Sequence, residues 1–294
     1  MFSVNGVSNS CDENRAKLEY QLNHLVVRGV EEKRVCLNEI NTLIIETTAV
    51  TVTAVLLCEL AKRAIKVIFC DEKYQPSFEC IPYYGSFENN KRILQQINWS
   101  KEIKGKVWQQ IIKAKIKGQA NNLFTNNMIK AADSLVSYTK EVKHHDSTNR
   151  EGHAAKVYFN ALFGKDFSRH DKENPINIAL NYGYTILLSA INRCIVSAGY
   201  LTQLGIWHDN EFNDFNFGSD LMEPFRPLVD SIVLNMEDLS LFRKVLNNLL
   251  NTKVRIDGKN TLLVNALTIY TRSVFFALNN NDAKAIKFME SYEL

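Results

Sequence analysis

Two carboxylates and one histidine in the second half of the chain have the chemistry to bind a divalent metal. Glu151 opens a helical stretch, His208 follows Gly205 at the end of a long apolar helix, and Glu223 precedes a proline. Carboxylate oxygens with one imidazole suit Mg²⁺ or Mn²⁺, whereas a thiolate cage would suit zinc. The residue types therefore predict a candidate site for Mg²⁺ or Mn²⁺.

Each of these residues also has a purely structural alternative. Thr148 and Glu151 fit a capping box, in which the glutamate satisfies a backbone donor at the start of a helix. His208 could be a hydrogen-bonded surface residue, and Glu223, like Asp220 before it, could complement a helix dipole. From spacing alone these structural roles are the more common ones.

A lysine-rich segment spans residues 101–117. Ile103, Val107, Ile111 and Ala114 form its predicted buried stripe, which would leave the lysines on the outer faces. Such a helix could follow a DNA phosphate backbone, although a solvated lysine face is the more common explanation. The lysines concerned are Lys101, Lys104, Lys106, Lys113, Lys115 and Lys117.

A histidine pair with a following aspartate lies just before Glu151. His144, His145 and Asp146 could attract a metal, but adjacent side chains on an exposed loop rarely form a site. This stretch is predicted to be a linker between helices.

Composition limits the class of protein. The chain has 294 residues, of which 46% are hydrophobic and 23% charged, as in ordinary globular proteins. A net charge of +3 excludes a uniformly basic nucleic-acid binder, so any DNA site must be a local patch. The apolar run 49–58 is too short to span a bilayer, and the N-terminus lacks a signal-peptide pattern. The cysteines show no C-x-x-C spacing. These features predict a cytoplasmic protein with reduced cysteines and no membrane association.

The elements that must position these residues fall into two parts. Up to about residue 85, short branched apolar runs alternate with polar residues and predict strands, with one helix embedded at 50–63. Pro76, Pro82 and Gly85 mark the end of this part. From Asn90 the apolar period is 3.6. The predicted helices are Asn90–Gln119, Asn121–Lys143, Glu151–Phe163, Ile176–Ala198, Leu221–Met236, Leu239–Asn251 and Thr261–Asn279.

Several motifs of the chain resemble, in order and identity, those of a known family. They are Glu151-Gly152-x-Ala154-Ala155-Lys156-x-Tyr158-Phe159, Asn181-Tyr182-Gly183-Tyr184, Gly205-Ile206-Trp207-His208-x-Asn210, and Asp220-Leu221-Met222-Glu223-Pro224-Phe225-Arg226-Pro227. Together they resemble the CRISPR-associated spacer integrases of the Cas1 family. The first half of the chain is most similar to the type II, subtype A branch.

The resemblance implies an α+β protein, with a small N-terminal β-sandwich-like domain at 1–88 and a larger all-helical catalytic domain at 89–294. It implies a homodimer through the N-terminal half, a larger complex with the Cas2 protein, and double-stranded DNA as the substrate. The implied reaction is the insertion of short DNA, the spacer precursor, at the edge of a CRISPR repeat.

The resemblance also implies roles for individual residues. Glu151, His208 and Glu223 would hold Mg²⁺ or Mn²⁺, with Asp220 as an auxiliary acid. Lys156 and Arg226 are candidates to neutralise phosphate charge, beside the lysines of 101–117.

Two alternatives to integration stay open at this point. One is a metal-dependent, structure-specific DNA nuclease of repair that uses the same residues with water as the nucleophile. The other is a noncatalytic DNA-binding scaffold in which Glu151 only caps a helix and His208 only packs.

Overall fold

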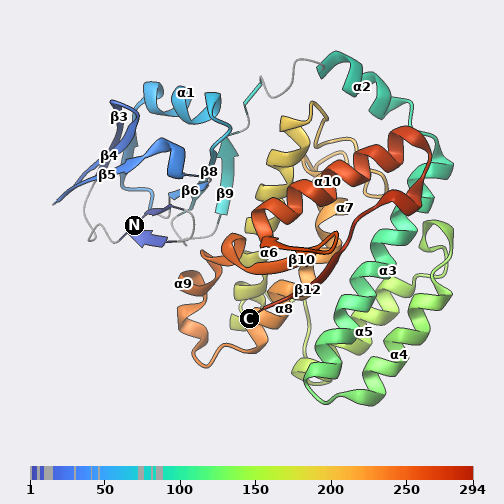
Figure 1. Cartoon of the computed structure of the whole chain (residues 1–294). Coiled ribbons are helices and arrows are strands. Elements are labelled where there is room, and N and C mark those ends of the chain that lie inside the picture. Colours follow the sequence, from blue (N-terminus) through green and yellow to red (C-terminus); the bar gives the residue numbers. More distant parts are fainter. Residues whose placement is uncertain are drawn as a thin grey trace.

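The computed structural model of the chain describes residues 2–4, 7–9, 16–29, 31–40, 42–45, 47–71, 76–80, 82–83 and 89–293. Strands dominate before residue 81, and helices dominate after residue 88 (Figure 1). The domain boundary predicted between residues 88 and 89 follows residues 84–88, which lie outside the described residues. Gly85, one of the residues expected to mark the end of the first part, is among them.

The N-terminal part contains two sheets and one helix. One sheet has the strand order β5-β4-β3-β7, and the other has the order β2-β1-β6-β8-β9. The bounds are β1 Phe2–Val4, β2 Val7–Asn9, β3 Ala16–Gln21, β4 His24–Arg28, β5 Glu32–Cys36, β6 Thr42–Ile45, β7 Val50–Val52, α1 Ala54–Lys62, β8 Lys66–Cys70 and β9 Pro76–Cys80. Side chains from both sheets and from α1, among them Leu18, Leu43 and Leu56, form one buried cluster. The sandwich-like part and its embedded helix are therefore confirmed, except that residues 50–52 of the predicted helix form strand β7.

The C-terminal part is built around two long helices, α3 and α6, which share one large apolar core with their neighbours (Figure 1). The helices are α2 Asn89–Ile97, α3 Lys101–Thr125, α4 Ile129–Glu141, α5 Arg150–Phe163, α6 Pro175–Ser197, α7 Asn216–Met222, α8 Arg226–Leu234, α9 Phe242–Leu246 and α10 Leu263–Asn280. A short 3₁₀ turn, Glu223–Phe225, joins α7 to α8. None of the helices in the described part combines the length and the apolar character needed to cross a bilayer.

The C-terminal part is not all-helical as expected. Strands β10 Lys253–Ile256, β11 Lys259–Leu262 and β12 Met289–Tyr292 form a small antiparallel sheet with the order β11-β10-β12. Val254 and Ile256 bury one face of β10 against the helical core, while Lys253 and Arg255 on the other face stay exposed. The α+β class stands, with this sheet as an addition to the helical part.

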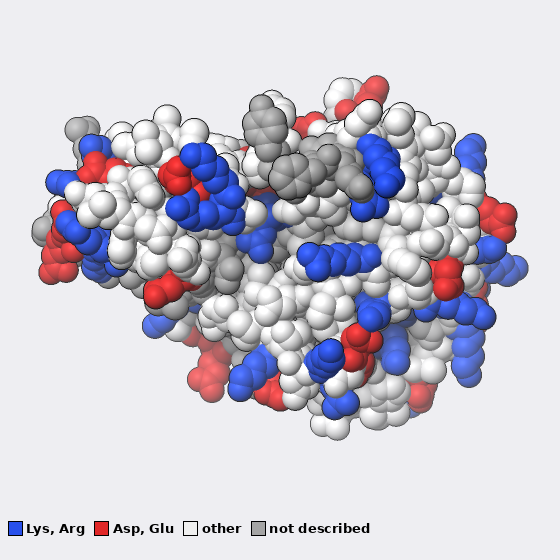
Figure 2. All heavy atoms as spheres, turned by 45° about the horizontal axis from the view of Figure 1, so that its top comes forward, with Lys and Arg blue, Asp and Glu red and all other residues white. Residues whose placement is uncertain are grey.

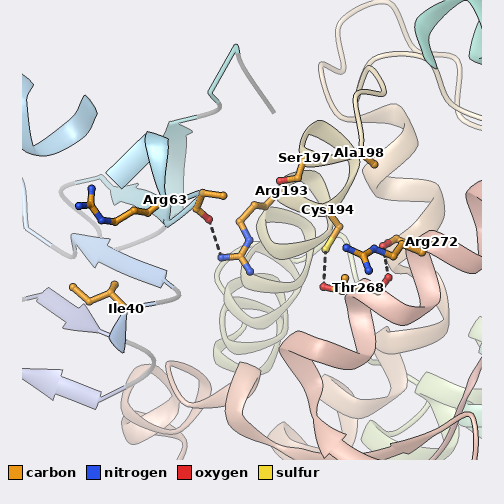
Figure 3. Close-up of a pocket in the computed structure, with 10 residues that line it drawn as sticks. Ile40, Arg63, Arg193, Cys194, Ser197, Ala198, Thr268 and Arg272 are labelled. Atoms are coloured by element: carbon orange, nitrogen blue, oxygen red, sulfur yellow. Dashed lines mark hydrogen bonds between the residues drawn. The ribbon is translucent and has the colours of Figure 1, made fainter. Parts of the chain in front are cut away.

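The strand-rich part docks on helix α6 through polar contacts. Lys66, at the start of β8, forms an ion pair with Glu79 and donates a hydrogen bond to the carbonyl oxygen of Ser189 in α6. Arg193, also in α6, donates to the carbonyl oxygen of Ala64 at 3.3 Å (Figure 3). A cavity of about 300 Å³ lies at this junction, with Arg63 on one side and Arg193 on the other (Figure 3).

The Lys66–Glu79 pair provides a stability test of this junction. Both side chains are almost fully buried, with 3% and 5% exposed. Lys66→Met is expected to lower the free energy of unfolding by about 3–5 kcal/mol, because it leaves the Glu79 charge buried without a partner. The double variant Lys66→Met, Glu79→Leu is expected to be close to the wild type, since the unpaired charge is gone. Urea denaturation of the two variants measures the difference, and equal instability of both would contradict this account.

Candidate active site

Glu151 and Glu223 meet at one positively charged group. The ammonium nitrogen of Lys115 lies 2.6 Å from Oε1 of Glu151 and 2.5 Å from Oε2 of Glu223. Lys115 comes from the middle of α3, Glu151 from the first turn of α5, and Glu223 from the 3₁₀ turn after α7. The fold thus brings together two carboxylates that are 72 residues apart in sequence, around a single cation.

Burial and charge oppose one another at Glu223. Its side chain is 4% exposed, and Arg226 also contacts it, with Nε 3.0 Å from Oε1. Burial alone would raise the pKa of Glu223, but the charges of Arg226 and Lys115 outweigh burial and lower that pKa. Burial likewise acts to lower the pKa of Lys115, but Glu223 and Glu151 outweigh it and raise that pKa. Both groups are therefore charged in the folded protein.

His208 is held by Asp220, the acid expected to be auxiliary. Nδ1 of His208 lies 2.6 Å from Oδ1 of Asp220, which is fully buried. Because an ionised carboxylate only accepts hydrogen bonds, Nδ1 carries the hydrogen, and Nε2 is left free to bind a metal in the neutral ring. This hydrogen bond raises the pKa of His208, and the nearby charges of Glu223 and Glu151 add to the effect. The predicted residues are thus electrostatic neighbours.

The loop before His208 is shaped by the same aspartate. The backbone N–H groups of Ile206, Trp207 and His208 all donate to the Asp220 carboxylate, at 2.6, 3.0 and 3.1 Å. A Cβ on Gly205 would lie 2.8 Å from Oδ2 of Asp220 and closer still to the carbonyl oxygen of His208. The glycine of the Gly205–His208 motif is therefore required by close packing.

One tryptophan packs against the imidazole of His208, and a second tryptophan stacks on the first. Trp108 of α3 is fully buried, stacks in parallel on Trp207 at 5.5 Å, and meets the His208 ring edge-on at 5.8 Å. Trp108 is therefore part of the core beside the site. Such packing restricts the rotamer of His208 and keeps its ring directed by Asp220.

The structural alternative for Glu151, a capping box with Thr148, is wrong. Helix α5 begins at Arg150, and its N-cap Asn149 has a left-handed backbone with φ of 51° and makes no side-chain cap. Instead, the buried carboxylate of Asp146 accepts hydrogen bonds from the backbone N–H groups of Arg150 and Glu151, at 2.9 and 3.0 Å. Asp146 thus supplies the cap that the alternative assigned to Thr148, so the side chain of Glu151 remains available for the site.

Asp146 and Lys115 are the two residues of the site whose positions were not expected. His144 and His145, next to Asp146, each donate a hydrogen bond from Nε2 to a carbonyl oxygen of the first turn of α3, at 3.0 Å. This stretch therefore connects the starts of α3 and α5 and is more than a linker. The signal for Asp146 was its position four residues before Arg150, where a side chain can reach the first free N–H groups of a helix.

The donor set fits a divalent metal, although no metal cage is preformed. In the described ranges, no three His, Cys, Asp or Glu side chains already converge as ligands. The ammonium group of Lys115 lies between the two glutamates. Oε2 of Glu223 is buried and, although this ammonium is close to it, has no partner with hydrogen-bond geometry. Two carboxylates already gathered around one cation, with an imidazole nearby, are the hard ligands that Mg²⁺ and Mn²⁺ prefer.

The lysines of α3 do not share one outer face. Lys115 is buried between the glutamates, which contradicts the expectation that it lies outside. Lys106 is paired with Glu102 at 2.6 Å, and Lys104 donates to the carbonyl oxygen of Gly205 at 3.3 Å. The reason is that α3 packs against several elements, including α4, α5 and the 223–225 turn, so its buried surface is broader than one stripe.

The remaining basic candidates lie at or near the surface. Lys101, Lys117 and Lys156 are exposed, and Lys113 is half-buried. Arg226 is partly exposed but engaged, since it contacts Glu223 and lies over the ring of Tyr184 at 4.6 Å. On the face in Figure 2, Lys and Arg side chains border the junction between the two parts of the molecule. The positive charge is thus confined to parts of the surface, as expected for a chain whose net charge is only +3.

The chain matches known proteins over most of its length. The family model for "CRISPR associated protein Cas1" matches residues 11–244. The "CRISPR-associated endonuclease Cas1" of Neisseria meningitidis serogroup C (strain 8013) is 32% identical over 287 residues, which cover 95% of this chain and 94% of that protein.

Solved structures agree with this match in fold. A "Casposase bound to integration product" has a TM-score of 0.73 at 21% identity, with 91% of this chain and 89% of that chain covered. A chain of a "Cas6-RT-Cas1–Cas2 complex" also has a TM-score of 0.73, at 18% identity; it covers 96% of this chain, which spans only 35% of that longer chain. Given the family match and the Neisseria relative, the chain belongs to the Cas1 family of CRISPR-associated proteins.

Proposed function

We propose that the chain is a metal-dependent DNA integrase that inserts short DNA into a CRISPR array. One observation carries the proposal: Glu151 and Glu223 converge on a single cation, with the oriented imidazole of His208 beside them. A noncatalytic scaffold would not need a buried carboxylate, that of Glu223, kept charged next to a second carboxylate, because burial disfavours the charge. The membership in a family with named endonucleases supports an activity at a phosphodiester.

The proposed reaction is a transesterification. The 3′-hydroxyl oxygen of the incoming DNA attacks the phosphorus at the edge of a repeat and loses its proton. The bond from that phosphorus to the leaving 3′-oxygen breaks, and the leaving oxygen takes up a proton to become a 3′-hydroxyl. One phosphodiester forms and one is lost, so no water is consumed. A bound Mg²⁺ or Mn²⁺ would polarise the scissile phosphate and stabilise the charge on the attacking and leaving oxygens.

The residues of the chain divide the work. Glu151, Glu223 and Nε2 of His208 would hold the ion, and Asp220 fixes the tautomer and the direction of the imidazole. Arg226 keeps Glu223 ionised and, because it is partly exposed, can also neutralise phosphate charge. Lys156 is exposed on α5, the helix that carries Glu151, and would contact DNA outside the site.

The assembly is proposed from the family and from the solved neighbours. We propose a homodimer formed through the N-terminal half and a larger complex with Cas2, acting on double-stranded DNA in the prokaryotic cytoplasm. A neighbour solved as a Cas1–Cas2 complex and one bound to an integration product support these partners. The assignment to the type II, subtype A branch stays a prediction.

A branched DNA that mimics a half-integrated product tests the reaction directly. With purified protein and Mn²⁺, an integrase should release the flap and reseal the target strand, and EDTA should stop both events. Release of the flap without resealing would favour the repair nuclease, whose nucleophile is water. If neither event occurs with the protein alone or with added Cas2, the catalytic proposal fails and the scaffold remains.

Basic residues of α3 lead to a prediction about DNA binding. Lys113 and Lys117 line a groove of about 790 Å³ that also contains Pro224, the neighbour of Glu223, so DNA at the site could reach both lysines. The double variant Lys113→Glu, Lys117→Glu is expected to weaken DNA binding and to reduce the slope of log Kd against log salt by about 1 for each lysine. Fluorescence anisotropy over a salt series measures the slope. The exposed Lys172, far from α3 in sequence, provides a charge-reversal control, and an unchanged slope in the double variant would remove α3 from the interface.

A further inference from the structure

The ammonium group of Lys115 lies between Glu151 and Glu223 and contacts the carboxylates of both. Its side chain is 8% exposed, and its nitrogen contacts one oxygen of each glutamate, at 2.6 and 2.5 Å. Lysine is rarely buried unless it is paired, so this position is costly without the two acids. The converse also holds, since Glu223 is 4% exposed and would repel Glu151 without a cation between them.

The ammonium resembles a metal ion in charge but differs from it in two respects. It carries one positive charge against two for Mg²⁺, and its contacts with oxygen are longer than the roughly 2.0–2.1 Å of a magnesium ligand bond. A divalent ion bound to both carboxylates would therefore occupy the space of the ammonium, and the two cations would repel each other. The flexible four-carbon stem of lysine allows its head group to move aside.

We propose that Lys115 is a resident counter-ion of the metal site, which holds Glu151 and Glu223 together before the ion arrives and is displaced when the ion binds. This inference rests on the proposed function, because it takes the two glutamates as metal ligands. Lys115 is a positioning residue: it stabilises the metal-free protein and competes with the metal. Metal affinity in the wild type is thus lower than the two carboxylates alone would provide.

The test compares Lys115→Met with the wild type in the full chain, with Mn²⁺ as the probe. Without metal, the melting temperature of Lys115→Met is expected to fall, because two neighbouring carboxylates lose their counter-ion. Isothermal titration and the electron paramagnetic resonance signal of free Mn²⁺ are expected to show binding at least about tenfold tighter, since a positive charge has left the site. Mn²⁺ should then raise the melting temperature of the variant more than that of the wild type.

Two further variants keep the outcome clear. Lys115→Arg retains the charge and should bind Mn²⁺ no more tightly than the wild type, and Lys115→Gln replaces Lys115→Met if that variant does not fold. A stability loss with unchanged or weaker Mn²⁺ binding in the neutral variants overturns the inference and leaves Lys115 as a structural residue only.

Failure of the proposed function has a different signature. Glu223→Gln in the Lys115→Met background should remove the effect of Mn²⁺ on melting. If Mn²⁺ binds neither the wild type nor any variant, the metal site itself is refuted, and this inference falls with it. If Mn²⁺ binds the wild type and Glu223→Gln abolishes binding, while Lys115→Met does not tighten it, only the inference about Lys115 is overturned.

Discussion

Glu223→Gln is expected to reduce strand transfer by at least about 1,000-fold, which corresponds to about 4 kcal/mol of transition-state stabilisation. Glu223 is the most buried of the proposed ligands and contacts both Lys115 and Arg226. An amide of the same shape lacks the negative charge that would hold a divalent ion there. Single-turnover formation of the resealed strand from branched DNA, with Mn²⁺ in excess, measures the loss.

The control for this variant must separate chemistry from folding. Glu32→Gln removes an exposed glutamate that is also paired with an arginine, Arg34, at 2.7 Å, and should change the rate by no more than about twofold because such surface pairs contribute little. Glu223→Gln leaves Lys115 and Arg226 less well neutralised, so rates are compared well below its own melting temperature. Full strand transfer by a folded Glu223→Gln protein would remove Glu223 from the site.

The predicted elements were most accurate where apolar periodicity was strong. The embedded helix and the strands around it were confirmed, because branched residues at alternate positions face one core. The predicted helix Asn90–Gln119 is in fact two helices, α2 and α3. Ser100 caps α3 by accepting a hydrogen bond from the N–H of Ile103 at 3.3 Å, a local start signal that the long apolar period concealed.

In the C-terminal sheet, one hairpin had a sequence signal that the prediction overlooked, whereas the pairing of the last strand had no local signal in the sequence. Asp257-Gly258, between β10 and β11, has positive φ at both residues and is a typical hairpin turn. Strand β12, by contrast, pairs with β10 from more than 30 residues away, and nothing in its own four residues specifies that partner.

The site itself was predicted from motif resemblance, and its central cation was not. Ile103, Val107 and Ile111 recur every four residues, and the next position in this series is Lys115 rather than the expected Ala114. A lysine that continues an apolar stripe indicates a buried lysine side chain, which needs a partner of opposite charge. Which acids would meet it could not be predicted, because the contact joins three elements that are distant in sequence.

Asp220→Asn tests whether His208 is positioned as a ligand or only packed. The fully buried carboxylate accepts hydrogen bonds from three backbone N–H groups and from the imidazole, and an amide cannot accept at both of its heavy atoms. Loss of such an orienting partner is expected to lower metal affinity or strand transfer by about 10- to 100-fold. Mn²⁺ titration and the branched-DNA assay measure the two effects.

A change in the pKa of His208 distinguishes positioning from a general loss of stability. The hydrogen bond to Asp220 raises that pKa, so the wild-type ring stays protonated to a higher pH than a free histidine. In metal-free Asp220→Asn the pKa should fall toward the ordinary value of about 6.5, as followed by the NMR signal of the ring Cε1 hydrogen. Asp214→Asn, an exposed change in the same loop, should leave the pKa and the activity unchanged. A lowered melting temperature with an unchanged His208 pKa would mean that Asp220 only shapes the loop, and the imidazole would then be directed by the stacked tryptophans alone.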